Sequence, residues 1–481
     1  MIRLLPLGVA LVLAGLSFFV LENANAAAAF LASAAALAIW NALILKRPNR
    51  VEVAPRKQHY LQACAQASVL AYWGWYWPPV YAFAPYLLAQ LLFAYGFDML
   101  LNWSRRDSYQ LGFGPFPVIF SINLFLWFKP DWFFLQFAMV ALGLAAKELI
   151  RWNRDGRRVH IFNPSSFPLA IVSLALLATG SSDITWGKEI ASTQFFPPQI
   201  YLFLFLIGLP GQFFFGVTSM TMSAVITTFL FGRLYFAVTG IYFFYDSYIP
   251  IAVFLGMHLL FTDPSTSPRT HLGRILYGVI YGLSTIALYQ LLGSAGLPTH
   301  YDKLLQVPLM NLSVKGLDNL VRFLPTTLPQ PRNLAYMAIW TVVFAALSAT
   351  DALGDNHPGQ WVPFWRQACQ EGRAYACPYA ADLHQSFCDR GSPWACNEAG
   401  LLYVALSRSG EDRRRLNIAG ATAPFRQGCD LGLDVACRNL NTVTSGGDNY
   451  TPSPPTSRDL SILSRGSKAE LPGPDRLAVV R

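Results

Sequence analysis

The chain has 481 residues, of which 53% are hydrophobic and only 13% charged, whereas soluble domains carry roughly 25% charged residues. This composition excludes an ordinary soluble enzyme. The formal net charge is +9, which in so apolar a chain we attribute to membrane orientation and contact with the lipid bilayer, with no nucleic-acid partner.

Two apolar segments open the chain. Residues 1–21 and 27–45 are each about long enough to cross a bilayer, and a loop rich in Lys and Arg follows them. Because cytoplasmic loops collect Lys and Arg, this loop and the N-terminus are predicted to lie in the cytoplasm. We assign residues 1–57 to two additional transmembrane helices with a basic loop.

Further apolar runs continue to residue 350. They lie at roughly 59–77, 79–101, 113–129, 131–150, 161–180, 199–216, 217–232, 234–247, 249–262, 274–292 and 334–350. With the first two segments they predict 12 or 13 membrane spans. Further basic loops begin at Arg105 and Lys147 and are also predicted to be cytoplasmic. The number of spans between these loops is consistent with that placement over the first half of the chain. We assign residues 58–353 to one membrane core.

Proline-rich polar segments interrupt two of these runs. The first reads Phe-Asn-Pro-Ser-Ser-Phe-Pro at 162–168, and the second reads Thr-Asp-Pro-Ser-Thr-Ser-Pro-Arg at 262–269. Asn, Asp and Ser side chains satisfy backbone amides at helix starts, and bare backbone is not tolerated against lipid. The similarity between the two segments predicts an internal duplication, with discontinuous helices that meet inside the bundle.

The ends of broken helices are where membrane proteins bind ligands and ions. The candidate cofactor-binding residues are therefore Asn163, Ser165, Thr262, Asp263 and Arg269. The structural alternative is that Asn163 and Asp263 only cap and brace the broken helices. No catalytic residue and no metal site is predicted from the sequence.

Two further ionisable residues, Asp98 and His258, lie at or near membrane depth, where such groups are costly and are functional candidates by default. For Asp98 we favour an ion pair with Arg105 or Arg106 near the cytoplasmic interface. For His258 we favour a packing role.

The segments GRRVHIFNPSSFPLAIV (156–172) and LGMHLLFTDPSTSPRTHLGRILYGVIYGL (255–283) resemble signatures of one membrane-protein family. That family contains the D-type component of the Rnf electron-transport complex, the B-type component of the sodium-translocating NADH:quinone reductase, and membrane proteins found beside enediyne biosynthesis clusters. The resemblance covers roughly residues 58–350. It implies an all-α, polytopic core of two inverted five-helix halves, and a role in electron transport or ion translocation.

The resemblance also implies flavin. Members of the family carry FMN bound to a threonine through a phosphodiester, within a Ser-x-Ala-Thr pattern. The matching loop here reads GSSDITWGKEIASTQFFPP (180–198), and neither Thr185 nor Thr193 has that context. Covalent FMN is therefore not expected, and any flavin would be FMN or riboflavin held non-covalently.

Six of the seven cysteines form three C-x7-C units, each with Gly three residues after the first Cys and Ala before the second. These units resemble cysteine-rich Sel-type repeats, relatives of tetratricopeptide repeats, in which each pair joins two helices across a glycine turn. The implied disulfides are Cys369–Cys377, Cys388–Cys396 and Cys429–Cys437. A zinc site is the rival interpretation, although C-x2-C pairs and paired histidines are missing from these units.

Residues 354–441 are assigned to this disulfide-bonded helical repeat domain, and 442–481 to a disordered tail rich in Pro, Ser and Gly. Because disulfides persist in oxidising compartments, the repeat domain is predicted to be periplasmic, in a protein of the bacterial inner membrane. Thirteen spans would place it there, whereas twelve would leave it in the cytoplasm.

Two functions remain open. The first is a membrane subunit of an Rnf-like electron-transport or ion-translocating system, an oxidoreductase or translocase subunit without a complete active site of its own. The second is a transporter-like or anchoring membrane protein without redox chemistry, whose repeat domain binds other membrane or periplasmic subunits. The family resemblance favours the first function. The missing flavin-attachment pattern and the fused repeat domain favour the second.

Overall fold

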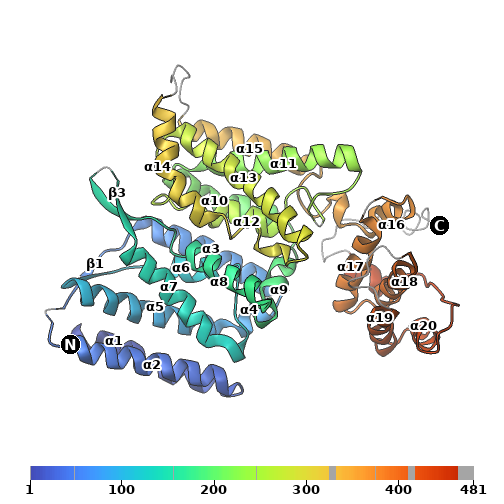
Figure 1. The fold of residues 1–481 in the computed structure, drawn as a ribbon, viewed down its shortest axis with the longest axis horizontal. Helices are drawn as coiled ribbons and strands as arrows, with labels where there is room; N and C mark the ends of the chain where they lie inside the picture. Colours follow the sequence, from blue (N-terminus) through green and yellow to red (C-terminus); the bar gives the residue numbers. More distant parts are fainter. Residues whose placement is uncertain are drawn as a thin grey trace. The chain divides into compact units, whose positions relative to one another are not determined.

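The computed structural model describes residues 2–47, 49–154, 156–244, 246–323, 332–373, 375–409 and 418–463. Over these residues the protein is mainly helical, with two short two-stranded sheets (Figure 1). The chain divides into two compact units. The membrane unit contains Met1–Thr228 and Ile251–Ala345, and the repeat unit contains Phe229–Pro250 and Ala346–Arg481.

The membrane unit is built mostly of helices. They are α1 (Leu5–Leu16), α2 (Ala24–Ile44), α3 (Lys57–Tyr76), α4 (Pro79–Ala82), α5 (Ala84–Arg105), α6 (Pro115–Asn123), α7 (Phe133–Leu149), α8 (Ser166–Thr179), α9 (Gly187–Thr193), α10 (Ile200–Phe215), α11 (Thr218–Thr239), α12 (Ile251–Leu259), α13 (His271–Ser294), α14 (Val307–Phe323) and α15 (Asn333–Ala349). Its strands are β1 (Arg50–Val53), β2 (Ser108–Leu111), β3 (Arg151–Arg154) and β4 (Arg157–His160). Both α11 and α15 run across the boundary between the units.

Six helical segments in the described part of the chain are long and apolar enough to cross a bilayer. They are Ile2–Val20, Ala24–Ile44, Ala84–Arg105, Pro130–Leu149, Thr218–Thr239 and His271–Ser294, and three shorter apolar helices accompany them (α8, α10 and α15). A polytopic helical membrane protein is therefore confirmed; of the 12 or 13 predicted spans, six meet the length and hydropathy of a full crossing among the described residues. The runs predicted at 217–232 and 234–247 are one helix, α11, followed by an irregular stretch.

Two helices of the membrane unit are too short to span a bilayer. Both α6 and α12 have nine residues, and nearly all of those residues are buried. Nine residues of α-helix rise only about 14 Å, against a hydrocarbon core of about 30 Å. Such buried half-length helices are typical of discontinuous spans. Pro115 begins α6, where the missing backbone N–H costs nothing, and Pro250 directly precedes α12.

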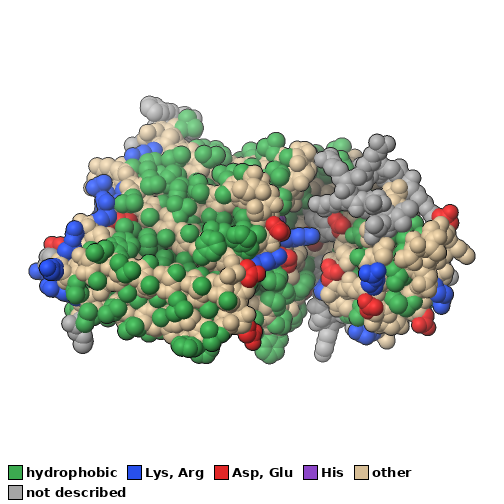
Figure 2. Space-filling model, turned by 60° about the horizontal axis from the view of Figure 1, so that its bottom comes forward, with side chains coloured by type: hydrophobic (Ala, Val, Ile, Leu, Met, Phe, Trp, Pro, Cys, Tyr) green, Lys and Arg blue, Asp and Glu red, His purple; other side chains and the backbone are tan. Residues whose placement is uncertain are grey.

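The three basic loops lie together at one end of the membrane unit. β1 from the first loop pairs in parallel with β2 from the second, with Arg50 opposite Ser108. In the third loop β3 and β4 form an antiparallel hairpin. The buried carboxylate of Glu148 joins the second and third loops, because it binds both Arg106 and Arg151. Figure 2 shows Lys and Arg gathered towards one end of a broad hydrophobic face.

The repeat unit contains short helices, several of which are joined to the next helix by a disulfide bond. They are α16 (Val362–Gln370), α17 (Ala376–Asp389), α18 (Pro393–Ser409), α19 (Ile418–Asp430), α20 (Asp434–Thr444) and α21 (Ser457–Leu463). All three predicted disulfides are present, namely Cys369–Cys377, Cys388–Cys396 and Cys429–Cys437. The glycines of the three turns have φ values of 67°, 91° and 90°, a region that favours glycine. Because these sulfurs bind one another, the zinc interpretation fails for these six cysteines.

The boundary between the units differs from the one we predicted at residue 353. The second half of α11 and the stretch after it pack with the start of the repeat unit, where Tyr242 contacts the rings of His357 and Phe364. The Arg373 side chain donates a hydrogen bond to the Gly240 carbonyl at 2.7 Å. Hydropathy could not show this, because aromatic residues suit a lipid face and a folded core equally well.

The disordered tail predicted for 442–481 is also corrected in its first part. α20 continues to Thr444, and residues 450–463 fold back onto α18 and α20 through hydrogen bonds. Residues 464–481 lie outside the described residues. The composition of the tail gave no sign of this docking, because the contacts that hold it come from side chains elsewhere in the chain.

One buried histidine makes the repeat unit sensitive to pH. His384 is 1% exposed, and its ring lies edge-on against Trp394 with the centroids 5.1 Å apart. Burial, and secondly the charge of Arg366, lower the pKa of His384 from 6.5 to about 3. The folded unit therefore keeps this ring neutral, whereas the unfolded chain takes up a proton below pH 6.5.

We therefore predict that the free energy of unfolding of the repeat unit falls by about 2 kcal/mol between pH 7 and pH 5 through His384 alone. Stability from this residue is complete above the unfolded pKa and is lost as the pH falls. Protease resistance of the repeat unit in urea, measured on the purified full chain at both pH values, reports the change. The apolar variant His384→Phe should lose about that much pH dependence. An unchanged pH dependence in the variant would contradict the prediction.

Candidate functional site

Asn163 joins the two helix breaks directly. It lies just before α8, and its Nδ2 donates to the carbonyl of Leu260, just past the end of α12, at 3.0 Å. Its Oδ1 accepts from the Ser165 amide at 2.9 Å, the Ser165 hydroxyl at 2.7 Å and the Ser166 amide at 3.2 Å. One buried side chain thus caps the first break and ties it to the second.

A second asparagine, on α14, also contacts both breaks. The Oδ1 of Asn311 accepts from the Asn163 amide at 3.0 Å. Its Nδ2 donates to the Tyr277 hydroxyl at 2.9 Å and lies 3.4 Å from the Thr266 carbonyl. Sequence reasoning missed this residue, because apolar residues alternate with polar ones between 304 and 321 and this pattern favours a helix lying on the membrane surface. The signal was a polar residue within the buried stripe of that helix, which also contains Val307, Met310, Val314 and Val321.

Asp263 braces the second break from within. Its carboxylate accepts from the Ser265 amide at 3.0 Å and the Thr266 hydroxyl at 3.2 Å, and it lies 3.5 Å from Nε2 of His160. These contacts hold the carboxylate in a fixed position within the break.

A further carboxylate, Asp318 on α14, fixes the start of α13. It accepts from the backbone amides of Arg269 and Thr270 and from the Thr270 hydroxyl, at 3.0 to 3.2 Å. Arg154 at the end of β3 pairs with Asp318 at 2.8 Å and also donates to the Ser267 carbonyl at 2.9 Å. Arg269 thus contributes its backbone amide to these contacts at the second break, while its side chain is exposed.

The meeting of the two breaks leaves a small pocket, here called the joint pocket, with a cavity volume of about 90 Å³. Its polar lining comprises Asn163, Ser165, Asp263 and Ser265 from the breaks, Gln58, His59, Gln62 and Gln66 from α3, Ser121 from α6, Lys147 from α7 and His160 from β4. Three of the five predicted residues therefore line one pocket. In the described part of the chain, Oε1 of Gln66 and Oγ of Ser121 are buried without a hydrogen-bond partner.

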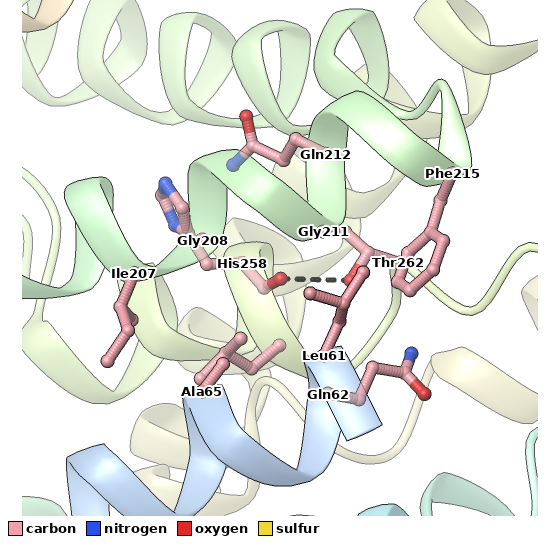
Figure 3. A pocket seen from close by; sticks show the side chains of 11 residues that line it. Leu61, Gln62, Ala65, Ile207, Gly208, Gly211, Gln212, Phe215, His258 and Thr262 are labelled. Atoms are coloured by element: carbon pink, nitrogen blue, oxygen red, sulfur yellow. Dashed lines mark hydrogen bonds between the residues drawn. The ribbon is translucent and has the colours of Figure 1, made fainter. Parts of the chain in front are cut away.

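A second, smaller pocket adjoins the joint pocket, with Gln62 and Leu259 lining both. Figure 3 shows α3 on one side, α10 on the other, and His258 and Thr262 between them. Its volume of about 20 Å³ holds little more than one water molecule. Thr262, the fourth predicted residue, lines this pocket and donates to the His258 carbonyl at 2.9 Å.

The second pocket also contains unpartnered polar atoms. His258 bonds the Phe254 carbonyl through Nδ1 at 2.7 Å, but its Nε2 has no partner among the described residues. Both polar atoms of the buried Gln212 side chain are likewise without a partner there. The packing role that we favoured for His258 therefore accounts for only one of its two ring nitrogens.

Sequence reasoning also missed the polar stripe of α3. His59, Gln62 and Gln66 follow a spacing of three and four residues, which places them on one helix face, and all three line the joint pocket. Polar residues along one face of an otherwise apolar helix indicate that this face points into the protein interior.

The partner predicted for Asp98 was wrong. Its carboxylate lies 3.7 Å from Nζ of Lys147 and accepts from the Asn102 amide group at 3.2 Å. Arg105 and Arg106 instead contact Glu148. Lys147 is the residue that links this ion pair to the joint pocket.

The joint pocket is too small to enclose a flavin. Drug-sized ligands occupy cavities of roughly 300–1,000 Å³, several times its volume. The two threonines of the loop at 180–198, where the sequence shows no attachment pattern, lie in the interior. Thr185 and Thr193 are buried, the first donating to the Ser182 carbonyl at 2.8 Å and the second accepting from Trp73 at 3.1 Å.

Comparison of the chain with family models, with curated proteins and with solved structures finds no match in any of the three. The site is therefore interpreted from its own geometry. The resemblance to Rnf-type membrane proteins stays a prediction. It rests on residues 156–172 and 255–283, which contain the two segments that meet at Asn163.

We predict that Asn163→Ala lowers the free energy of unfolding by about 2–4 kcal/mol. The substitution removes a helix cap worth about 1 kcal/mol and leaves the buried Leu260 carbonyl unsatisfied, at a cost of about 1–3 kcal/mol. Asn163→Ser keeps a capping oxygen but does not reach Leu260, so its effect should be intermediate.

Thermal unfolding of the detergent-purified protein, followed by tryptophan fluorescence, measures these differences. Thr179→Ala is the matched control, because Thr179 is an exposed residue at the far end of α8. An Asn163→Ala variant that melts with the control would show that the joint does not depend on this side chain.

Proposed function

We propose that the membrane unit is a transporter-like protein that binds a small, uncharged polar solute in the joint pocket. The observation that carries this proposal is the position of the pocket, where two helix breaks meet and two buried polar atoms lack partners among the described residues. Ligand sites of many transporters lie between such half-helix ends.

The chemistry of the pocket lining favours a neutral solute. Lys147 pairs with Asp98, and the Asp263 carboxylate is held by contacts with His160, Ser265 and Thr266. Lys147 and Asp263 are therefore already engaged by other side chains. What remains includes the carboxamides and the His59 imidazole of α3 and the hydroxyl of Ser121, which can donate and accept hydrogen bonds. A volume of about 90 Å³ limits the solute to a few heavy atoms.

The second pocket supports a path rather than a closed site. Gln62 and Leu259 separate the two pockets, so a solute leaving the joint pocket would pass between these side chains. Beyond them, Gln212 and Nε2 of His258 offer hydrogen-bonding atoms that are unpartnered in the described part of the chain. A sequence of such groups is what a polar solute needs to cross an apolar bundle.

A second candidate function is the Rnf-like electron-transport or ion-translocating subunit. Its support is that the two segments resembling that family are those joined by the Asn163 side chain. Non-covalent FMN or riboflavin would then bind outside the joint pocket as it stands, because of the volume of that pocket. Flavin absorbance in the purified protein, or flavin released on denaturation, separates this function from the first.

To test the solute proposal, we use urea and glycerol as probes. Stopped-flow light scattering of proteoliposomes should show uptake several-fold faster than in empty liposomes for at least one of them. The paired substitution Gln66→Leu and Ser121→Ala should remove most of the increase, because it removes both unpartnered groups. Ser192→Ala, an exposed serine outside the pockets, is the control. Uptake equal to that of empty liposomes, with correctly folded protein, would contradict the proposal.

The cellular placement belongs to the same proposal. We place the protein in the bacterial inner membrane, with the basic end of the membrane unit in the cytoplasm and the disulfide-bonded helices of the repeat unit in the periplasm, where they bind other membrane or periplasmic subunits. The clustering of three basic loops and the presence of three disulfides support this orientation.

We predict that non-reducing digestion of the protein from intact cells yields peptides linked within each C-x7-C pair. An alkaline phosphatase fused after the C-terminus should be active, because that enzyme needs an oxidising compartment. Free thiols at the six positions, together with an inactive fusion, would place the repeat unit in the cytoplasm instead.

A further inference from the structure

Residues 450–459, here called the strap, follow the turn at Gly446 and Gly447 and contain Pro452, Pro454 and Pro455. Residues 450–456 form neither helix nor strand, and α21 begins at Ser457. Proline-rich segments of this kind are already extended before they bind, so they lose little entropy when they dock. The surface beneath the strap, here called the groove, is formed by α18, α19 and α20.

Two buried asparagines hold the strap by its backbone. Asn439 on α20 accepts from the Thr451 amide at 2.9 Å and donates to the Thr451 carbonyl at 2.8 Å. Asn397 on α18 donates to the same carbonyl at 3.3 Å and accepts from Asn439 at 2.8 Å. Because these bonds involve only main-chain atoms of the strap, any residue with a backbone N–H satisfies them.

The ends of the strap have more selective contacts. The Tyr450 ring is stacked on Phe425 with centroids 6.0 Å apart, beside a core cluster that includes Val404 and Val443. At the other end the Asp459 carboxylate accepts from the Ser392 hydroxyl at 2.6 Å and the Trp394 amide at 3.3 Å. These donors lie at the start of the 17-residue helix α18, where a negative charge is favoured.

The groove is held in shape by covalent bonds of its own. Cys396, which is bonded to Cys388, precedes Asn397 directly, and Cys437, bonded to Cys429, lies two residues before Asn439. Trp394, between Ser392 and Cys396, donates its indole N–H to the Ser453 carbonyl at 2.8 Å. The two disulfides therefore fix the backbone beside both asparagines.

We propose that this groove is a receptor for an extended, proline-containing segment of a partner protein, and that the strap occupies it as an internal competitor. The partner segment carries an aromatic residue, a following residue with a backbone N–H, and a carboxylate about nine residues after the aromatic one, as Tyr450, Thr451 and Asp459 do. This inference deepens the proposal that the repeat unit binds partner subunits, and rests on it. It is independent of the joint pocket.

The tether sets the strength of the competition. A segment linked to its own site through a short flexible connection acts at an effective concentration of about millimolar. The strap therefore shields the groove from weak ligands and yields only to a segment that binds more tightly or is present on a protein held nearby. The groove therefore binds segments of proteins that are held nearby in preference to peptides that are free in solution.

The test compares the full chain with a chain that ends at Gly447. The probe is a fluorescent synthetic peptide with the sequence of residues 449–463, and its binding is followed by polarisation. The shortened chain should bind the peptide at least about tenfold more tightly than the full chain, in which the tethered strap competes. A peptide with Ala in place of Tyr450 and Asn in place of Asp459 should bind more weakly.

The asparagine contacts are tested on the shortened chain. Asn439→Leu should abolish binding of the peptide, whereas Asn441→Leu, an exposed asparagine on the same helix, should leave it unchanged. A shortened chain that keeps its three disulfides and its helical circular dichroism but binds no peptide would overturn the proposal. So would equal binding by both chains, or full chains that dimerise by exchanging straps. Solute uptake by the membrane unit, measured on the same shortened chain, distinguishes these outcomes from failure of the joint-pocket proposal.

Discussion

The membrane unit depends on the hydrogen bond between the Asn163 side chain and the Leu260 carbonyl. A helix that breaks inside a bilayer exposes main-chain groups, and each one left without a partner costs several kcal/mol. Here the Asn163 side chain of the first break satisfies the Leu260 carbonyl at the second, while Asn311 and Asp318 on α14 bind further backbone groups of both. The two breaks, about a hundred residues apart in the chain, are therefore held together by side chains that also satisfy their backbone.

The same constraint locates the candidate site. Many polar side chains in the interior, such as Asn163 and Asp263, form hydrogen bonds with the backbone. Others, such as Gln66, Ser121 and Gln212, have atoms without a hydrogen-bond partner among the described residues, and they line the two pockets. Residues that only brace the joint and residues available to a ligand are thus different sets. The sequence pattern pointed to the first set, and the geometry adds the second.

What could be predicted from the sequence was local. The caps at Asn163 and Asp263 act within three residues, and the disulfides close turns of eight, so a short pattern determines each. Asn311 was missed because its partners are far away in the chain and its helix looks like a surface helix. Hydropathy continues smoothly past the end of α11, so the sequence suggested two runs at 217–247 where the structure has one helix and an irregular stretch. The docked strap was missed because composition says nothing about a groove built by other helices.

Buried asparagines do the same work in both units, but in different surroundings. Asn163 and Asn311 bind main chain inside the membrane unit, whereas Asn397 and Asn439 bind the strap in the repeat unit. In lipid a released backbone group finds no other partner, so opening the joint is costly. In the repeat unit water replaces the lost bonds, and each bond is worth only about 1 kcal/mol net. Hydrogen bonds from asparagine to backbone are therefore hard to break in the membrane unit and easy to exchange in the repeat unit. For this reason we assign partner exchange to the strap and not to the two helix breaks.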